Sequence, residues 1–318
     1  MSRLLTAQEF YYYMDNNFTW APFFKITNLC NYRCAHCCER SGPDATPTFI
    51  PLADVYTIIE KFKTVKNTMP VAFISGGEPM MAYNTMSYYI PQIMKSLARA
   101  GFAVEIKTNA GWVLGDKAET IFKDLTYMSF KFPKTFVSYH LSLDKFHPQS
   151  HKTAMEFLRW YYNNDVLSER ANIHLFFDLP ETVTKLFVDL DQQYNIHLDL
   201  QAPQSQECAM VGANMFAGKN KYIKIEPYHG ITNRGRASDN KIATRDAPSV
   251  VQNFGTPGET HAIAFDNNGM AYFDCAGDVV KTPYKNERGK IKQIEQIKKE
   301  LFKMLYDKYI SENTKYTK

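Results

Sequence analysis

Four cysteines lie within nine residues near the N-terminus, in the segment ITNLCNYRCAHCCER. Three of them, Cys30, Cys34 and Cys37, have the spacing C-x3-C-x2-C, and Cys38 falls outside that pattern. A compact loop with three thiolates suits a cubane [4Fe–4S] cluster, in which three irons take protein sulfur and the fourth iron stays open. An open metal position is typical of a catalytic rather than a structural site.

Two other interpretations of these cysteines fit less well. No secretory signal precedes them and the remaining cysteines, Cys208 and Cys275, are few and scattered, which disfavours a disulfide pair. A zinc knuckle needs a fourth Cys or His at close spacing. His36 is a candidate for that ligand, but it lies between two of the cysteines and would strain the loop.

A second motif follows in the segment VAFISGGEPM, residues 71–80. The run 71–74 is apolar and rich in strand formers, so it predicts a buried strand. Gly76 and Gly77 allow the backbone to approach a ligand closely, and Glu78 offers a carboxylate next to exposed backbone groups. A tight turn after a strand is the alternative for the two glycines.

Together the two motifs resemble those of the radical S-adenosylmethionine (SAM) enzymes, with CNYRCAHC as the cluster loop and GGEP about 40 residues later as the SAM-amine motif. The resemblance implies that Cys30, Cys34 and Cys37 hold the [4Fe–4S] cluster, and that the open iron chelates the amino and carboxylate groups of SAM. It further implies reductive cleavage of SAM to a 5′-deoxyadenosyl radical, with an external electron donor of the flavodoxin or ferredoxin type.

The same resemblance assigns further residues to SAM. Gly76, Gly77, Glu78 and Pro79 form the SAM-amine motif. The residue before the third cysteine usually lies by the adenine, and here it is His36, for which a solvent-facing loop histidine is an equal alternative. The CxHC spacing is common in the branch of the family that modifies peptides.

Strand and helix patterns alternate along the first two thirds of the chain. This order predicts parallel strands with helices packed outside them, and the resemblance sharpens it to a partial (β/α)6 barrel with a small C-terminal α+β extension. Strands are expected at 23–26, 71–74, 104–108, 136–143, 173–177 and either 196–200 or 222–225. Helices are expected at 53–65, from Thr85 or later to about 100, and at 117–125, 151–163, 181–194 and 291–307.

Polar residues end four of these strands, which is where the chemistry of such barrels is located. Besides the two motifs, they are Asn109 after the third strand and Ser142 and Asp144 at the end of the fourth. In the family such residues often contact SAM, and a hydroxyl and a carboxylate suit its ribose and amine. Turn formation explains Asn109 and Asp144 almost as well.

Composition agrees with a globular enzyme. The 318 residues suffice for one main domain with an appendage, the net charge of +4 is too mild for a nucleic-acid partner, and no apolar run of 18 residues predicts a membrane span. Without a secretory signal, the expected location is the cytoplasm, where free thiols and an oxygen-sensitive cluster are stable.

The C-terminal part, residues 236–318, differs from the core domain expected at 1–235. GRA at 235–237 and the hairpin sequence AIAFDNNGMAYFDCAG look like the start of the SPASM or twitch extension of peptide-modifying radical SAM enzymes. That extension carries extra clusters, whereas this part of the chain has only Cys275, with Cys208 before it. We therefore expect a remnant without an auxiliary cluster, in which these two cysteines are buried structural residues or hydrogen-atom donors.

Three functions follow from these patterns. The first is a radical SAM enzyme that modifies a ribosomally made peptide or a protein. The second is a radical SAM enzyme with a small-molecule or nucleotide substrate, because a chain without auxiliary clusters has lost one feature of the peptide branch. The third is a non-catalytic Fe–S scaffold or sensor, which the intact GGEP motif and Ser142 disfavour because a scaffold needs no SAM pocket.

Overall fold

The computed structural model describes residues 5–132, 137–201, 214–218, 221–227, 235–242, 260–273 and 280–314. In these ranges the strands join one 11-stranded sheet of order β11-β10-β9-β1-β2-β3-β4-β5-β8-β7-β6. The strands are β1 (Thr19–Lys25), β2 (Val71–Ser75), β3 (Ala103–Thr108), β4 (Val137–Leu143), β5 (Ala171–Phe177), β6 (Asp199–Gln201), β7 (Asn214–Gly218), β8 (Lys221–Pro227), β9 (Thr260–Asp266), β10 (Met270–Phe273) and β11 (Lys281–Pro283).

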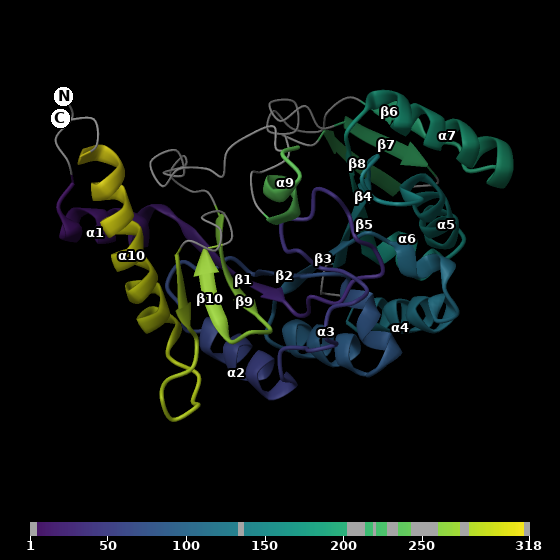
Figure 1. Ribbon diagram of the computed structural model, residues 1–318. Helices are drawn as coiled ribbons and strands as arrows, with labels where there is room; N and C mark the ends of the chain where they lie inside the picture. The colour runs from purple at the N-terminus through teal and green to yellow at the C-terminus, as the bar shows by residue number, and fades with distance from the viewer. Residues whose placement is uncertain are drawn as a thin grey trace.

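The helices alternate with the central strands. They are α1 (Ala7–Asn17), α2 (Leu52–Phe62), α3 (Tyr89–Arg99), α4 (Ala118–Lys131), α5 (Ser150–Tyr162), α6 (Asp165–Arg170), α7 (Pro180–Tyr194), α9 (Gly235–Asp239) and α10 (Ile294–Thr314), with short 3-10 helices η1 (Pro79–Asn84) and η2 (Gly111–Leu114). Strands β1, β2, β3, β4, β5 and β8 are parallel. Helices α2 to α7 cover the outer side of this curved sheet (Figure 1). The predicted partial (β/α)6 barrel is confirmed.

The structure decides between the two candidates for the sixth barrel strand. Strand β8 pairs in parallel with β5, whereas β6 pairs antiparallel with β7 at the edge of the sheet. The segment 222–225 is therefore the barrel strand, and 196–200 is not. A parallel strand needs a crossover connection, and α7 with the following segment supplies it.

The third helix begins at Tyr89 rather than at Thr85, because of Pro91. Proline lacks the backbone N–H and is tolerated only in the first turn, where N–H groups have no partner within the helix. Pro91 is the third residue of α3, and Thr85 instead caps η1 with its backbone N–H on the carbonyl of Ala82.

The two faces of the parallel strands differ in character. On β4, Val137, Tyr139, Leu141 and Leu143 are at most 2% exposed and pack toward the helices. The alternate residues Ser138, His140 and Ser142 are partly accessible on the inner face. Parallel strands are usually apolar on both faces, so the inner face of this sheet is not simply a second core.

The C-terminal hairpin extends the barrel sheet. Strand β9 pairs in parallel with β1, and β10 returns antiparallel to β9 through a turn in which Gly269 has φ of +84°. The predicted Asn-Gly hairpin is confirmed. Since β9 continues the sheet of the core, the expected division at residue 235 stays a prediction.

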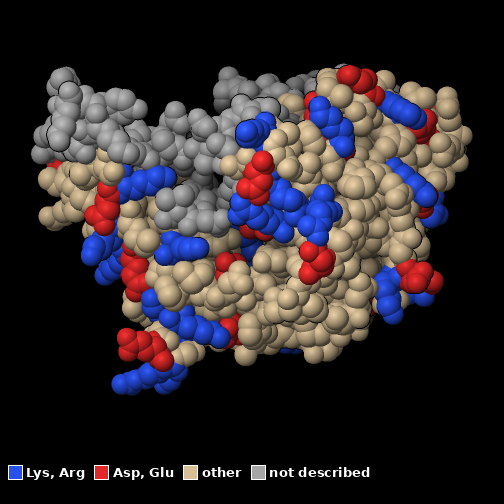
Figure 2. Space-filling model, viewed as in Figure 1, with Lys and Arg blue, Asp and Glu red and all other residues tan. Residues whose placement is uncertain are grey.

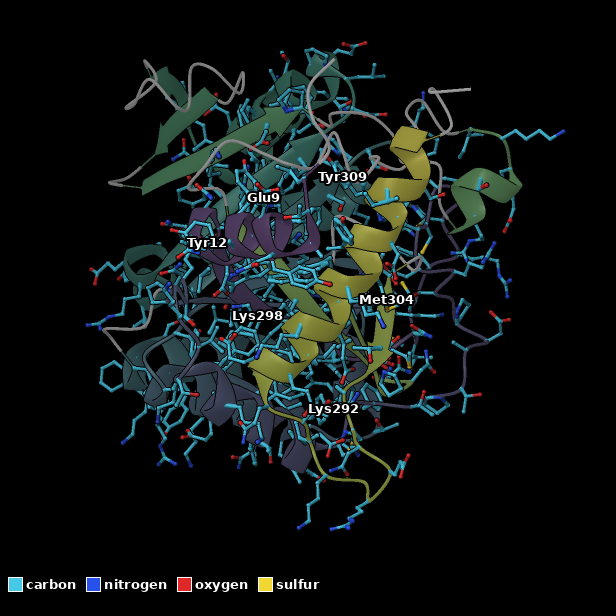
Figure 3. The ribbon with its side chains drawn as sticks, turned by 90° about the vertical axis from the view of Figure 1, so that its left-hand side faces the viewer. Glu9, Tyr12, Lys292, Lys298, Met304 and Tyr309 are labelled. Atoms are coloured by element: carbon cyan, nitrogen blue, oxygen red, sulfur yellow. The ribbon has the colours of Figure 1, made fainter. Side chains whose placement is uncertain are left out.

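The first and last helices pack together beside β1. The ring of Phe10 on α1 lies 5.6 Å from the ring of Tyr309 on α10, and the Lys298 ammonium is 2.6 Å from Asp15 Oδ1. Figure 3 shows α10 crossing α1, with Lys298 and Tyr309 along the shared side. Neither α1 nor α6 was expected from the sequence, because the aromatic and apolar residues of α1 are consecutive and set no helical period, and α6 has only six residues.

No helix in the described part of the chain is long and apolar enough to span a membrane. Positive and negative side chains are interspersed on the face seen in Figure 2. The mild net charge of +4 is consistent with this mixture.

Candidate active site

The loop with the cysteines leaves the end of β1 and is held by the end of β2. The backbone N–H of Gly77 donates to the carbonyl of Thr27 at 2.6 Å, and that of Glu78 donates to the carbonyl of Leu29 at 2.9 Å. The GGEP segment therefore lies beside the chain that enters the cysteine loop. Two motifs that are about 40 residues apart in sequence meet at one rim of the barrel.

Close approach of backbones explains the glycine pair. A Cβ atom at Gly77 would lie 2.2 Å from the carbonyl oxygen of Leu29, and one at Gly76, whose φ is +122°, would lie 2.4 Å from that of Thr27. Neither position accepts a side chain without a shift of the backbone. The group that approaches these glycines most closely in this structure is the cysteine loop itself.

Glu78 joins the ends of β2 and β3. Its carboxylate is fully buried and accepts hydrogen bonds from the N–H of Met80, the hydroxyl of Thr108 and the N–H of Asn109, at 2.8 to 3.1 Å. Burial raises the pKa of Glu78 to about 7, although the hydrogen bonds act in the opposite direction. Pro79 is buried directly after it as the first residue of η1. Both carboxylate oxygens of Glu78 accept hydrogen bonds, so Glu78 holds the ends of β2 and β3 together. A direct contact of Glu78 with SAM stays a prediction.

Asn109 brings the end of β3 to the cysteines. Its amide donates to the sulfur of Cys30 at 3.4 Å and to Oδ1 of Asn31 at 3.0 Å. Its own Oδ1 accepts from the N–H of Gly111 at 2.7 Å, which fixes the amide orientation. Asn109 therefore lies against the cysteine loop, and its predicted contact with SAM stays a prediction.

The burial of the cysteines fits a ligand set of three. Cys30 and Cys34 are buried and Cys37 is half-buried, whereas Cys38 is exposed. Burial raises the pKa of the Cys30 thiol to about 12, so in the protein alone this residue is a thiol although Tyr32 N–H donates to its sulfur at 3.4 Å. A bound metal deprotonates a coordinating thiol outright. The donor set of this loop therefore fits an Fe–S cluster.

Arg236 holds the cysteine loop from the other side. Its backbone N–H donates to the carbonyl of Cys37 at 2.9 Å, its Nε to the carbonyl of Cys34 at 2.8 Å, and its terminal nitrogen to the carbonyl of Ser41 at 2.6 Å. The side chain of Arg236 thus satisfies two carbonyls, and its backbone N–H a third, in a loop that has no regular secondary structure. A guanidinium suits this task because its five N–H groups point in fixed directions.

Two further contacts join α9 to the loop. The amide of Asn240 donates to the carbonyl of Ala35 at 2.9 Å, and Arg40 pairs with Asp239 through two hydrogen bonds of 3.1 and 2.9 Å. GRA was expected only as a family feature, and no function was predicted for Arg236 or Asn240. The GRA motif marks the position of Arg236 in the sequence. Its hydrogen bond to Cys34, about 200 residues away, cannot be derived from a local sequence pattern.

His36 lies in a group with Asp144 and His147, whose ligand atoms lie within 4.8 Å of one another. Oδ2 of Asp144 is 2.7 Å from Nδ1 of His147, and Oδ1 accepts from the N–H groups of Phe146 and His147. Burial lowers the pKa of His147, but hydrogen bonds with Asp144 and Cys34 outweigh it and raise the pKa to about 10. Both carboxylate oxygens of Asp144 are therefore hydrogen-bonded within the turn that follows it. Its contact with SAM stays a prediction.

The ring of His36 packs 4.9 Å from Phe146 and 4.8 Å from His147. Burial lowers its pKa to about 4, so the ring is neutral at pH 7. Its Nδ1 is buried with no hydrogen-bond partner among the described residues. An orphaned buried nitrogen beside the cysteine loop fits a site that receives a ligand, and the predicted contact of His36 with the adenine stays a prediction.

The remaining candidates are placed as follows. Ser142 lies on the inner face at the end of β4, opposite Phe176 of β5 in the sheet register. Cys208 and Cys275 lie outside the described residues, so their functions stay predictions.

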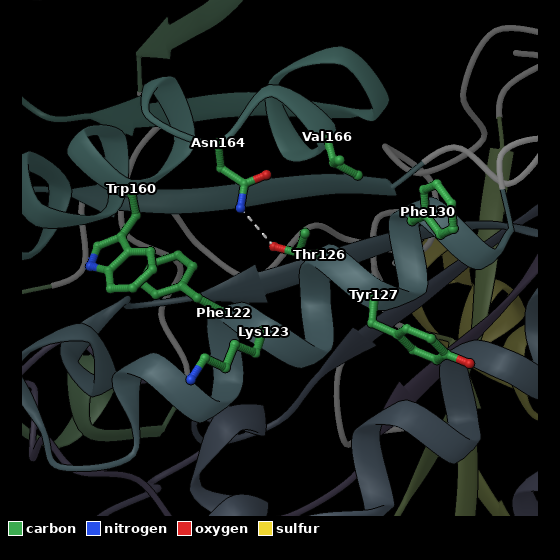
Figure 4. A pocket seen from close by; sticks show the side chains of 8 residues that line it. All are labelled: Phe122, Lys123, Thr126, Tyr127, Phe130, Trp160, Asn164 and Val166. Carbon is green, nitrogen blue, oxygen red and sulfur yellow. Dashed lines mark hydrogen bonds between the residues drawn. The ribbon is translucent and has the colours of Figure 1, made fainter.

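A separate pocket of about 310 Å³ lies between α4, α5 and α6, lined by Phe122, Thr126, Trp160 and Asn164 among others (Figure 4). None of the cysteines lines it, so it is distinct from the site described here.

Comparison with known proteins agrees with this geometry. Residues 24–177, just under half of the chain, match the family described as the Radical SAM superfamily. Members of that superfamily use a [4Fe–4S] cluster and SAM. The chain is 25% identical over 91 residues to putative protein YfkA of Bacillus subtilis, which is 27% of this chain and 22% of YfkA.

Solved structures with similar folds include two SAM-bound proteins. Streptococcus suis SuiB bound to S-adenosylmethionine has a TM-score of 0.38 and 12% identity, covering 80% of this chain and 60% of SuiB. Native anSMEcpe with bound AdoMet has a TM-score of 0.44 and 12% identity, covering 89% of this chain and 80% of that protein. The chain therefore spans about 60% of the SuiB length and about a fifth of YfkA.

Proposed function

We propose that this chain is a radical SAM enzyme that modifies a peptide or protein. The observation that carries the proposal is the joint placement of the three-cysteine loop and GGEP at one rim, with Asn109 on the sulfur of Cys30. Cys30, Cys34 and Cys37 would hold a [4Fe–4S] cluster, which would supply the electron for reductive cleavage of SAM and thereby for removal of a hydrogen atom from the substrate.

The residues of this chain divide the remaining tasks. Cys30, Cys34 and Cys37 are the proposed cluster ligands, and Arg236 keeps their loop closed through its carbonyl contacts. Glu78 fixes the relative position of the rims of β2 and β3. His36, whose buried Nδ1 has no hydrogen-bond partner among the described residues, and Ser142 are the proposed contacts of SAM at this rim.

The peptide class rests on features of the sequence and on how they are placed. CxHC, GRA and the Asn-Gly hairpin are typical of the peptide-modifying branch. In this chain GRA docks on the cysteine loop and the hairpin extends the barrel sheet at β1, so both are integral to the site's scaffold. A small-molecule substrate is the alternative.

The test uses the anaerobically reconstituted protein with dithionite and SAM. We expect 5′-deoxyadenosine to form, and not to form with the Cys34→Ala variant. Addition of a short peptide encoded beside the gene should then give a peptide of changed mass. Absence of 5′-deoxyadenosine from the wild-type protein would refute radical SAM activity, and turnover with small molecules alone would refute the peptide class.

A further inference from the structure

The inner face of the barrel carries a row of lysine, histidine and serine side chains at one level of the sheet. Lys25 pairs in register with Ser75 of β2, and Lys107 of β3 pairs with His140 of β4. His140 in turn pairs with His174 of β5, and His174 with Lys224 of β8. We call these residues the lumen row: Lys25, Ser75, Lys107, His140, His174 and Lys224.

Most charges at this level already have a partner of opposite sign. Nε2 of His140 is 3.0 Å from Oε2 of Glu105, and Nε2 of His174 is 3.0 Å from Oε2 of Glu226. Lys224 lies 3.2 Å from the same oxygen of Glu226.

Lys25 is also neutralised, because its ammonium is 2.5 Å from Oε1 of Glu39. The carboxylates of Glu39, Glu105 and Glu226 near the row are thus each in contact with a cation or an imidazole. A fourth carboxylate, that of Asp266, pairs in register with Lys25 and accepts hydrogen bonds from the N–H groups of Asn268 and Met270.

Lys107 differs from these residues. Its ammonium lies over two aromatic rings, 4.9 Å from the centroid of Phe23 and 5.5 Å from that of Phe73. Among the described residues no carboxylate oxygen lies within 4.0 Å of it, and the side chain is half-buried. The two rings themselves stack at 5.5 Å. Burial raises the pKa of Glu105, but its hydrogen bond with His140 and the charges of His140 and Lys107 lower it overall, so Lys107 acts on this carboxylate from beyond 4.0 Å. A half-buried ammonium that is held by aromatic faces and makes no direct ion pair favours the approach of an anion.

The position of Lys107 relates this cation to the proposed chemistry. Lys107 precedes Thr108 and Asn109, and the Asn109 amide contacts the sulfur of Cys30. At about 3.3 Å per residue, the Cα atoms of Lys107 and Asn109 are roughly 7 Å apart along the chain. An anion bound at Lys107 therefore lies on the inner face just below the rim that carries the cysteine loop.

We propose that the lumen row, with Lys107 as its direct contact, binds an anionic group of the substrate. This inference rests on the proposed function, because it names the chemistry of the substrate of the same site. The anion is a carboxylate or a phosphate, since an ammonium acts as a point charge and suits both. Phe23 and Phe73 form an apolar wall for the part of the substrate next to the anion.

The experiment measures binding to the reconstituted, SAM-loaded protein without reductant. The probes are N-acetyl-glutamate amide, its neutral isostere N-acetyl-glutamine amide, and N-acetyl-phosphoserine amide. We expect at least one of the two anions to bind at least tenfold more tightly than the glutamine probe. Lys107→Met should abolish this preference and Lys107→Arg should retain most of it.

Lys123→Met is the matched control. It removes the same charge from the outer side of α4, where Lys123 pairs with Glu119, and should leave the preference intact. A stronger effect with glutamate identifies a carboxylate, and one with phosphoserine identifies a phosphate. Equal binding of charged and neutral probes, or a preference that survives Lys107→Met, would overturn the proposal. Because no reductant is present, this result is independent of SAM cleavage, whose absence from the wild-type protein would refute the proposed function instead.

Discussion

The two faces of the parallel sheet contrast most clearly on β4. Leu141 is 1% exposed and lies in the apolar core under the helices, whereas its neighbour His140 is on the inner face and pairs with Glu105. The same alternation continues on β3, where Ile106 is buried and Glu105 and Lys107 are half-buried. The helix-covered face holds the large apolar core, whereas the inner face combines polar side chains with a small apolar cluster around Phe23 and Tyr272.

The largest expected effect separates the two faces directly. Leu141→Ala should lower the free energy of unfolding by about 3 kcal/mol, because it leaves a cavity in a core that cannot fully collapse. Ser142→Ala, one residue further along β4, should cost less than about 1 kcal/mol. Denaturant unfolding of both variants measures the difference. Equal losses would show that the inner face is packed like the outer one.

A second prediction concerns the rim between the faces. Arg236→Ala should destabilise the protein by about 2 kcal/mol, because it removes charge-assisted hydrogen bonds to carbonyls of the cysteine loop. Arg40→Ala removes an exposed ion pair with Asp239 on the same helix and should cost about 0.5 kcal/mol. Thermal unfolding of the two variants tests whether α9 stabilises the cysteine loop through Arg236 or only through the exposed ion pair of Arg40 with Asp239.

The third prediction uses pH to probe the inner face. Burial, together with the neighbouring His140 and Lys224, lowers the pKa of His174 to about 3. Its folded-state pKa is below the unfolded value of about 6.5, so the unfolded chain takes up a proton that the folded protein does not. Stability contributed by neutral His174 is present above pH 6.5 and is lost as the pH falls below it.

The expected loss from this group is about 1.4 kcal/mol per pH unit between pH 6 and 4. His174→Gln should remove that part of the slope in denaturant unfolding measured across this range. The same substitution at His197, which is exposed, is the control. An unchanged slope in the His174 variant would mean that the inner face is well hydrated and not desolvated.

Much of the barrel was predictable because its strands are short apolar runs separated by amphipathic helices. The strand at β2, for example, begins at Val71 as expected. The sixth strand was not decided, since 196–200 and 222–225 have the same local pattern and only pairing with β5 distinguishes them. The inner-face charges were visible in the alternation of AVEIKT and VSYHLSL, but the sequence does not tell which face the helices cover.

The site was predictable to a similar extent. Cys30, Cys34, Cys37 and GGEP were found by spacing, and the structure brings the two motifs together. The close approach at Gly77 was expected from SAM, whereas in the structure the backbone of Leu29 occupies that space. Contacts of this kind depend on how distant segments pack, which spacing alone does not encode.

The central claim is that one loop holds one cluster through three cysteines, and Cys37 and Cys38 test it as adjacent residues. Anaerobic reconstitution of the wild-type protein should give about four irons and four sulfides per chain. Cys37→Ala should lose most of this iron and the brown chromophore, whereas Cys38→Ala, which changes an exposed cysteine, should retain both. Iron loss in the Cys38 variant equal to that in the Cys37 variant, or about eight irons in the wild-type protein, would contradict the account.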